Sequence, residues 1–229
     1  MIKKESRQFN ISVEGINCEK MYFEHLSKLI NNSDRSTYNL KIAPKKMSPL
    51  EYAKRNSYKP VERRNGKKLP YIHIQDIEDY YDDYQRTKFY KMIDEMRAAE
   101  KKFGVIYQLG YSNYTFELWM LLHAADITHA VQNRHSYLPL INSWFHRNYS
   151  SIDEFKSEVE FQKILKEYVT LDSIQQAICR AEKIVQNNVT DNKRRETYKG
   201  ITFFRDNPDV SVHEVVKMVF EVCKVNQNH

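Results

Sequence analysis

The stretch that decides the fold is Tyr71–Tyr84, YIHIQDIEDYYDDY. It opens with an alternating, apolar run that is typical of a buried strand. The run ends abruptly in acids, in a 229-residue chain whose formal net charge is +6; these acids are Asp76, Glu78, Asp79, Asp82 and Asp83. A concentration of negative charge directly after a predicted strand needs a physical explanation.

Strands and helices alternate around this stretch. Alternating apolar residues predict strands over 9–13, 38–43, 69–75 and 105–109. Helical spacing predicts helices over 18–31 and 86–102, and Ser48 is placed to cap a short helix. This order predicts an α/β fold with a mostly parallel sheet flanked by helices, and any active site is expected at the carboxyl ends of the strands.

The sequence changes character from Thr115 onward. Apolar spacing there predicts helices in the segments 116–125, 151–168, 173–187 and 210–225. We therefore expect an α/β catalytic core over residues 1–125. A mainly helical C-terminal portion over residues 126–229 is expected to pack on this core.

Cysteine usage and the lack of long apolar segments indicate the compartment. Cys18, Cys179 and Cys223 are widely separated and form no CxxC pair, which argues against a disulfide framework or a structural zinc site. The sequence has no signal peptide and no apolar run of membrane-spanning length. These features predict a soluble protein of the cytoplasm.

Acids follow two of the predicted strands. Glu14 ends the first strand, and Asp76 and Glu78 end the third, so that a parallel sheet brings them to one edge. Carboxylates gathered there repel one another unless a cation neutralises them, and hard oxygen ligands suit Mg²⁺ or Mn²⁺. The alternative is that such acids cap the next helix or keep a loop soluble, a role that fits Asp82 and Asp83.

Glu117 is the third acidic position of interest, because it lies within the apolar segment 116–125. Burying a lone carboxylate is costly, so Glu117 should pair with a base, accept hydrogen bonds or bind a metal. The first turn of a helix also favours its charge. An internal ion pair, or a cap linked to Ser112 and Asn113, is the structural alternative.

Several segments, in this order, resemble the RloB-like family, which belongs to the wider Toprim group and includes AbiLii-type abortive-infection proteins. VEGINCEKMYF at 13–23 matches its "EG…TE…YF" opening, and SNYTFELWMLLH at 112–123 is similar to its "SNPxFExWLLLH". NPDVSVHEVV at 207–216 looks like its "NPxTxVxxLV" closing segment. The chain departs from the family pattern at Cys18 for Thr, at Tyr114 for Pro, and at Asp76-x-Glu78 for Asp-x-Asp.

The resemblance implies a Toprim-like fold and metal-dependent cleavage of DNA or RNA, possible substrates including tRNA. It also implies a role in anti-phage defence with an ATPase partner. Glu14 corresponds to the Toprim glutamate and Asp76 with Glu78 to its acidic pair. Asp79 is the other candidate for the second position, and Glu117 is a further candidate ligand.

Cations outside the acidic centre are expected to hold a nucleic acid. Tyr52 and Tyr58 lie among them and can stack on bases. The candidate cations are Lys45, Lys46, Lys54, Arg55, Lys59, Arg63, Arg64, Lys67 and Lys68. A solvated loop is the alternative for this basic set, and a non-cleaving nucleic-acid-binding or regulatory subunit is the alternative for the protein.

Three further polar residues are predicted to be structural. His123 is not on the same helical face as Glu117, so a satisfied core histidine is expected. His73 should pack or hydrogen-bond within its strand. Cys18 is expected to be a small residue at a helix start, because the sequence gives it no neighbouring base.

Overall fold

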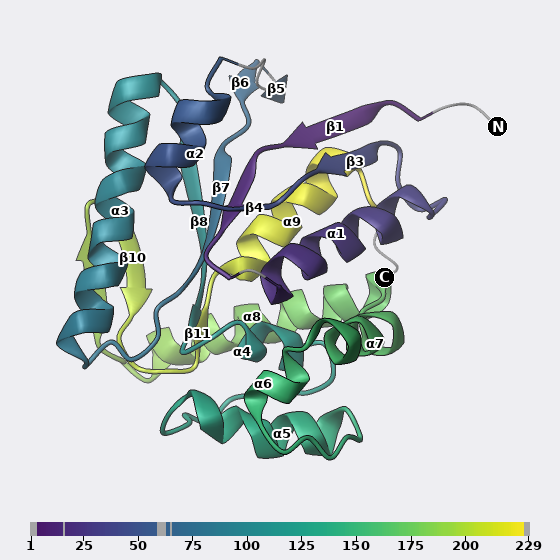
Figure 1. Ribbon diagram of the computed structural model, residues 1–229, viewed down its shortest axis with the longest axis vertical. Coiled ribbons are helices and arrows are strands. Elements are labelled where there is room, and N and C mark those ends of the chain that lie inside the picture. Colours follow the sequence, from purple (N-terminus) through teal and green to yellow (C-terminus); the bar gives the residue numbers. More distant parts are fainter. Residues whose placement is uncertain (1–3, 16, 59–62, 65, 227–229) are drawn as a thin grey trace.

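The structure is a computed structural model that describes residues 4–15, 17–58, 63–64 and 66–226. At its centre is a five-stranded sheet in the order β11-β8-β7-β2-β4 (Figure 1). These strands are β11 (Asp209–Val210), β8 (Tyr107–Asn113), β7 (Tyr71–Asp76), β2 (Ile11–Val13) and β4 (Lys45–Lys46). All neighbours are parallel except β11, which is antiparallel to β8. The predicted α/β class and mostly parallel sheet are confirmed.

Strand β7 lies in the middle of this sheet, and its side chains are buried on both faces up to Gln75. That explains its apolar composition, since a strand covered on both faces loses the usual polar alternation. Its register pairs Val13 with Ile74, and Asp76 with Ser112. Glu14, the residue after β2, therefore lies at the same edge of the sheet as Asp76.

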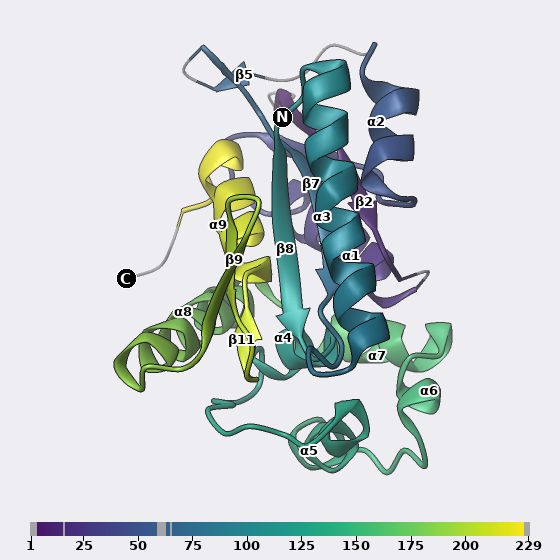
Figure 2. The same cartoon turned by 90° about the vertical axis from the view of Figure 1, so that its left-hand side faces the viewer.

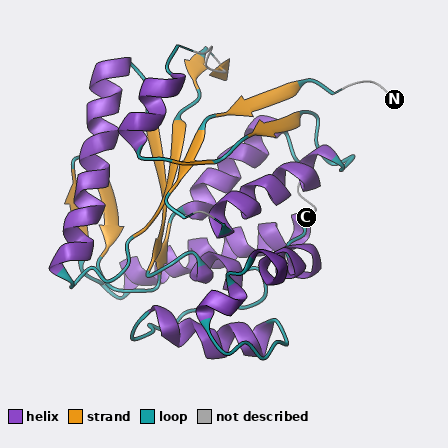
Figure 3. Cartoon of the chain, in the orientation of Figure 1, coloured by secondary structure: helices purple, strands orange, loops and turns teal. Residues whose placement is uncertain are grey.

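Helices cover both faces of the sheet (Figures 2 and 3). On one face α2 (Pro49–Asn56) and α3 (Asp83–Phe103) pack on Tyr71 and Tyr107. On the other face α1 (Cys18–Asn31) and α9 (Val212–Cys223) pack on Ile72 and Ile74. The remaining helical segments are α4 (Glu117–Leu121), the 3₁₀ turn η1 (Arg134–Ser136), α5 (Tyr137–Trp144), α6 (Ile152–Phe155), α7 (Glu158–Tyr168) and α8 (Leu171–Thr190).

The described residues also form three short strand pairs outside the central sheet. β1 (Ser6–Phe9) pairs in parallel with β3 (Asn39–Ile42), and β5 (Arg63–Arg64) pairs with β6 (Lys67–Lys68). β9 (Arg195–Tyr198) and β10 (Ile201–Phe204) form a hairpin against α3 (Figure 1).

Local capping explains where two helices begin. The Ser48 side chain accepts a hydrogen bond from the Glu51 amide at the start of α2. The Asp82 carboxylate accepts one from the Gln85 amide at 2.9 Å, and Asp83 is the first residue of α3. The predicted helix-start role of Asp82 and Asp83 is confirmed.

The structure differs from the predicted elements in several places. The strand predicted at 38–43 corresponds to β3, which pairs with β1 outside the central sheet. Helix α4 ends at Leu121 instead of Ala125. Strand β8 runs on to Asn113, beyond the predicted end at residue 109. Gly110 lies within it, where a Cβ would lie 2.8 Å from Ile74 Cδ1. The β9–β10 hairpin occupies a region that the sequence predicted to be mostly helical.

The C-terminal portion contributes to the sheet as well as to the helical layer. β11 pairs with β8, and Val215 of α9 packs beside Gly110 of β8. The boundary at residue 125 stays a prediction. Within the described ranges, no helix combines the length and the apolar character needed to cross a membrane.

Candidate active site at the carboxyl edge of the sheet

A cavity of about 310 Å³ lies at the edge where β2 and β7 end. Carboxylates dominate the chemistry of its wall. They belong to Glu14, Glu19, Asp76 and Glu78, and the Lys156 ammonium joins them. The structure thus brings together three of the residues that the sequence singled out, and it adds two that the sequence analysis did not place in the site.

Glu14 is held from three sides. Its Oε2 accepts hydrogen bonds from Gln75 Nε2 and from the Asp76 backbone amide, the latter at 3.2 Å. Its Oε1 forms an ion pair with the Lys88 ammonium from α3. These contacts fix the position of the carboxylate and present it as a hydrogen-bond acceptor.

A buried relay leads from Glu14 into the sheet. His73 Nε2 lies 3.2 Å from Gln75 Oε1, and His73 Nδ1 lies 2.8 Å from Ser12 Oγ. Because Gln75 donates its Nε2 hydrogen to Glu14, its Oε1 must accept from His73 Nε2–H. Burial lowers the pKa of His73 to about 4, so the ring is neutral and its Nδ1 accepts from Ser12. The prediction that His73 hydrogen-bonds is confirmed.

Asp76 carries an oxygen without a partner. Its Oδ1 is buried and accepts no hydrogen bond within the described residues. Burial raises the pKa of Asp76 well above its usual value, and the neighbouring carboxylates of Glu19, Glu117 and Glu14 raise it further. This oxygen is the clearest sign that the cavity is built to receive a cation or a donor.

Glu19 is a site residue that the sequence analysis missed. Only 5% of it is exposed, and its carboxylate lies directly over Gly15, where a Cβ would come within 2.0 Å of Oε2. Burial raises the pKa of Glu19 to about 7, and Glu117 adds to the effect. Glu19 lies on the same helical face as the buried Tyr22, Phe23 and Leu26 of α1. This spacing was the sequence signal that could have identified Glu19 as a buried acid.

Glu117 is buried at the first position of α4 and forms an ion pair with Lys156 at 2.7 Å. The sequence left open whether Glu117 forms an internal ion pair, acts as a cap or binds a metal, and the structure shows the internal ion pair. Burial opposes the charge on Lys156, but Glu117 and Asp76 outweigh it and raise the pKa of this lysine. Lys156 follows α6, so the helical portion of the chain supplies a cation to the carboxylate cluster.

Glu78 and Asp79 point to different surroundings. Glu78 adopts a left-handed backbone conformation with φ of 60°, its amide donates to the Tyr114 carbonyl, and its side chain lines the cavity. Burial raises the pKa of Glu78. Asp79 is exposed, and its Oδ1 accepts a hydrogen bond from the Tyr81 amide at 2.9 Å. Glu78 thus lines the same cavity as Asp76, whereas Asp79 lies in the exposed turn.

The carboxylates do not form a complete metal coordination shell. Across the described ranges, no three His, Cys, Asp or Glu side chains are grouped closely enough to hold a metal ion. Glu14 and Glu117 instead form ion pairs with Lys88 and Lys156. The donor chemistry nevertheless fits a hard divalent cation, because Asp76 Oδ1 is buried without a partner and the Glu19, Glu117 and Glu14 carboxylates are near enough to raise the pKa of Asp76.

Comparison with known proteins covers most of the chain. The family described as "RloB-like protein" matches residues 9–219. The chain belongs to the RloB-like family. No curated protein and no solved structure matches it.

The basic residues of this RloB-like protein are divided between two ends of the sheet. Lys45 and Lys46 form β4 beside β2, and Lys46 pairs with Val13 near the carboxylates. The β5–β6 hairpin lies at the opposite end, where β7 begins (Figure 1). The exposed Lys54 and Arg55 belong to α2, and Arg55 pairs with Glu51. Lys59 and the side chains of Arg63, Arg64 and Lys67 lie outside the described residues, whereas Lys68 is exposed.

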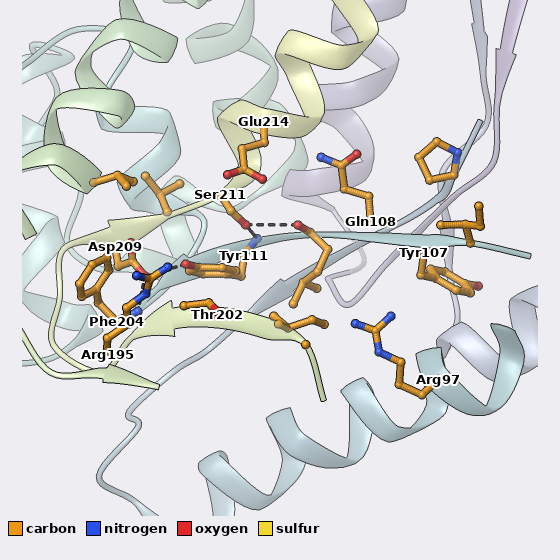
Figure 4. A pocket seen from close by; sticks show the side chains of 17 residues that line it. Arg97, Tyr107, Gln108, Tyr111, Arg195, Thr202, Phe204, Asp209, Ser211 and Glu214 are labelled. Atoms are coloured by element: carbon orange, nitrogen blue, oxygen red, sulfur yellow. Dashed lines mark hydrogen bonds between the residues drawn. The ribbon is translucent and has the colours of Figure 1, made fainter. Parts of the chain in front are cut away.

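A larger cavity, of about 560 Å³, lies between β8, β10 and α9 (Figure 4). None of the candidate residues that the structure describes lines it. Burial raises the pKa of Asp209, at its wall, to about 6. The Asp209 carboxylate accepts hydrogen bonds from the Tyr111 hydroxyl and the Phe204 amide. The closing segment that resembles the family therefore fastens β8 to the hairpin.

Two further predictions are confirmed. His123 is a satisfied core histidine: Nδ1 lies 2.9 Å from the Trp119 carbonyl and Nε2 lies 3.2 Å from the Tyr22 hydroxyl. Cys18 is the first residue of α1 and is buried; burial raises the pKa of its thiol, which keeps it protonated.

Proposed function

We propose that this RloB-like protein is a divalent-metal-dependent nuclease that cleaves phosphodiester bonds of DNA or RNA. The observation that carries the proposal is the group of carboxylates around the buried, unpartnered oxygen of Asp76. Membership of the RloB-like family and the Toprim-like order of the acids point to the same chemistry.

Asp76, Glu14 and Glu78 are the proposed ligands of Mg²⁺ or Mn²⁺. Glu19 and Glu117 add negative charge behind them. When bound, such an ion would withdraw charge from a phosphate oxygen and make a bound water more acidic. The Asp76 oxygen would then gain the partner that it lacks in the protein alone.

The protein's own groups have distinct tasks in this reaction. Gln75, the Asp76 amide and Lys88 hold Glu14 in place. The alternative to a ligand role for Glu14 is that of a general base, which accepts a proton from an attacking water. Lys156 lines the same cavity and offers a positive charge to a phosphate oxygen. Its pair with Glu117 keeps the ammonium beside Asp76.

The test is cleavage of labelled single-stranded DNA, double-stranded DNA, RNA and tRNA by purified protein with Mg²⁺ or Mn²⁺. Asp76→Asn and Glu14→Gln should each lower the rate by more than about 100-fold, since even an outer-shell partner is commonly worth 10–100-fold. Thermal unfolding confirms that each variant folds. Cleavage that survives both substitutions would eliminate the site.

Glu78→Gln and Asp79→Asn form a matched pair for the second ligand. The first should lose activity, because Glu78 lines the cavity, whereas the second should stay within about twofold of the wild type. The reverse result would assign the metal to Asp79 instead.

A second candidate is a non-cleaving nucleic-acid-binding or regulatory subunit. The observation that favours it is the pairing of Glu14 and Glu117 with lysines in place of a three-ligand shell among the described residues. We place either function in anti-phage defence beside an ATPase partner. Binding without cleavage of any of the four substrates, with a candidate ATPase present, would select the second function.

A further inference from the structure

A second cavity, of about 420 Å³, adjoins the acidic one, and Glu14 lines both. It lies between α3 and the strands β2, β4 and β7. Its volume is in the usual range for small-ligand sites. We call it the lysine cavity, after Lys46, Lys88 and Lys91 in its wall.

One face of α3 lines one side of this cavity. Lys88, Lys91, Met92 and Glu95 follow the spacing of one helical face. Lys91 and, across from it, Lys46 on β4 are exposed, and neither has an ion-pair partner among the described side chains. Their positive charges are therefore available to a ligand at this edge of the sheet.

Besides the lysines and the floor formed by Glu14, His73 and Gln75, the cavity has an apolar surface, Ser48 and the Glu95 carboxylate. Met47 and Met92 line the cavity with Val13 and Pro49. Glu95 also lines it, and its Oε2 is buried without a hydrogen-bond partner in the described structure. An occupant that suits all three features has negative charge for the lysines, an apolar face for the methionines and an N–H or O–H donor for Glu95.

The floor of the cavity does not require a ligand to complete its hydrogen bonds, because its polar side chains hydrogen-bond to one another. His73 and Gln75 are buried and hydrogen-bonded within the relay that ends at Glu14. Any occupant must therefore be recognised by the walls. A nucleotide unit meets these requirements through its phosphates, the flat surface of its base, and the donors of its base or sugar.

We propose that the lysine cavity binds the nucleotide unit next to the scissile phosphate. Lys46 and Lys91 contact its phosphates, Met47 and Met92 pack on the base or sugar, and Glu95 accepts a hydrogen bond from it. The inference rests on the proposed nuclease function, and it deepens that function by assigning the substrate strand to one side of Glu14.

This assignment also separates two groups of cations. The β5–β6 hairpin lies at the other end of β7, and a strand of this length spans roughly 17–20 Å. Lys68 therefore cannot contact the same nucleotide unit as Lys46. Of the predicted basic residues whose side chains the structure describes, Lys46 alone lines the cavity.

The first experiment measures binding of a fluorescently labelled oligothymidylate by anisotropy in EDTA, where metal-dependent cleavage cannot occur. Lys46→Gln/Lys91→Gln should weaken binding at least tenfold. It should also reduce the slope of log K against log[salt] by about 1.4, at about 0.7 for each lost phosphate contact. The control is Lys101→Gln/Lys102→Gln, which removes equal charge from exposed positions in the last turn of α3, outside the cavity. An equal loss in both double variants would overturn the proposal.

The second experiment locates the ligand in the wild-type protein. Methionine methyl groups are labelled with ¹³C, and a thymidine dinucleotide is titrated in without divalent ions. The Met47 and Met92 signals should shift, whereas those of the buried Met96 and Met120 should not. Unchanged Met47 and Met92 signals at saturation would refute the site. Occupancy without cleavage in the presence of Mg²⁺ would instead refute the nuclease function alone.

Discussion

Replacing Glu19 with glutamine should stabilise the metal-free protein, and the gain should depend on pH. Glu19 is nearly fully buried among other carboxylates, and burial raises its pKa to about 7. In an unfolded chain the same side chain has a pKa near 4.5. Folding therefore takes up a proton at neutral pH, or else leaves an unfavourable buried charge.

The sign and size follow from these two values. A raised pKa means that the stability contributed by Glu19 is fully present below 4.5 and is lost as the pH rises through about 7. Glutamine imitates the protonated carboxyl and avoids the loss. The gain from Glu19→Gln should be under about 1 kcal/mol at pH 5 and about 3 kcal/mol at pH 8. For a chain of this size the larger value raises Tm by about 6–12 °C.

The assay is chemical and thermal unfolding in EDTA at pH 5, 6, 7 and 8. Glu24→Gln serves as the control, because Glu24 lies on the same helix with 43% of its side chain exposed. Its effect should be small at every pH. A gain from Glu19→Gln that is the same at pH 5 and pH 8, or a loss at pH 8, would refute the reasoning.

Three further predictions test neighbouring contacts. Lys156→Met leaves the buried Glu117 charge without its cation and should destabilise the protein by about 3–5 kcal/mol in urea unfolding, with recovery in Lys156→Met/Glu117→Gln. Gly15→Ala places a Cβ against the Glu19 carboxylate and should cost about 1–3 kcal/mol in thermal unfolding, a loss that Glu19→Ala should relieve. His73 should show the Nε2–H tautomer in ¹⁵N NMR, because Nε2 donates to Gln75 and Nδ1 accepts from Ser12. Gln75→Met should remove that tautomer preference and lower any cleavage rate. An Nδ1–H tautomer in the wild-type protein would contradict the relay.

Local sequence signals predicted much of the fold. The period of apolar residues gave the helix at Cys18–Asn31 with both its ends, and Asp82 was recognisable as a helix start from its place before an amphipathic segment. The convergence of Glu14 and Asp76 followed from topology, since parallel strands place their carboxyl ends at one edge.

The missed features depend on contacts between distant segments. Nothing near Lys156 in the sequence indicates that it pairs with Glu117, because the two residues are far apart in the chain and meet only in the folded protein. The β9–β10 hairpin is likewise stabilised from outside, as Phe203 packs on Phe89 and Tyr198 stacks on Tyr90. The choice between Glu78 and Asp79 depends on a single backbone conformation, the left-handed one at Glu78.

The pairing of Glu117 with Lys156 also shows that the acidic centre belongs to both parts of the chain. Glu14, Glu19, Asp76 and Glu117 all precede residue 126, yet the cation that compensates Glu117 follows it. The Glu19, Glu117 and Glu14 carboxylates each raise the pKa of Asp76, whereas Lys156 lowers it. Removing Lys156 would therefore increase the electrostatic repulsion among these acids. The helical portion thus stabilises the charges that the sheet brings together, and a fragment ending at residue 125 would retain the carboxylates while lacking this cation.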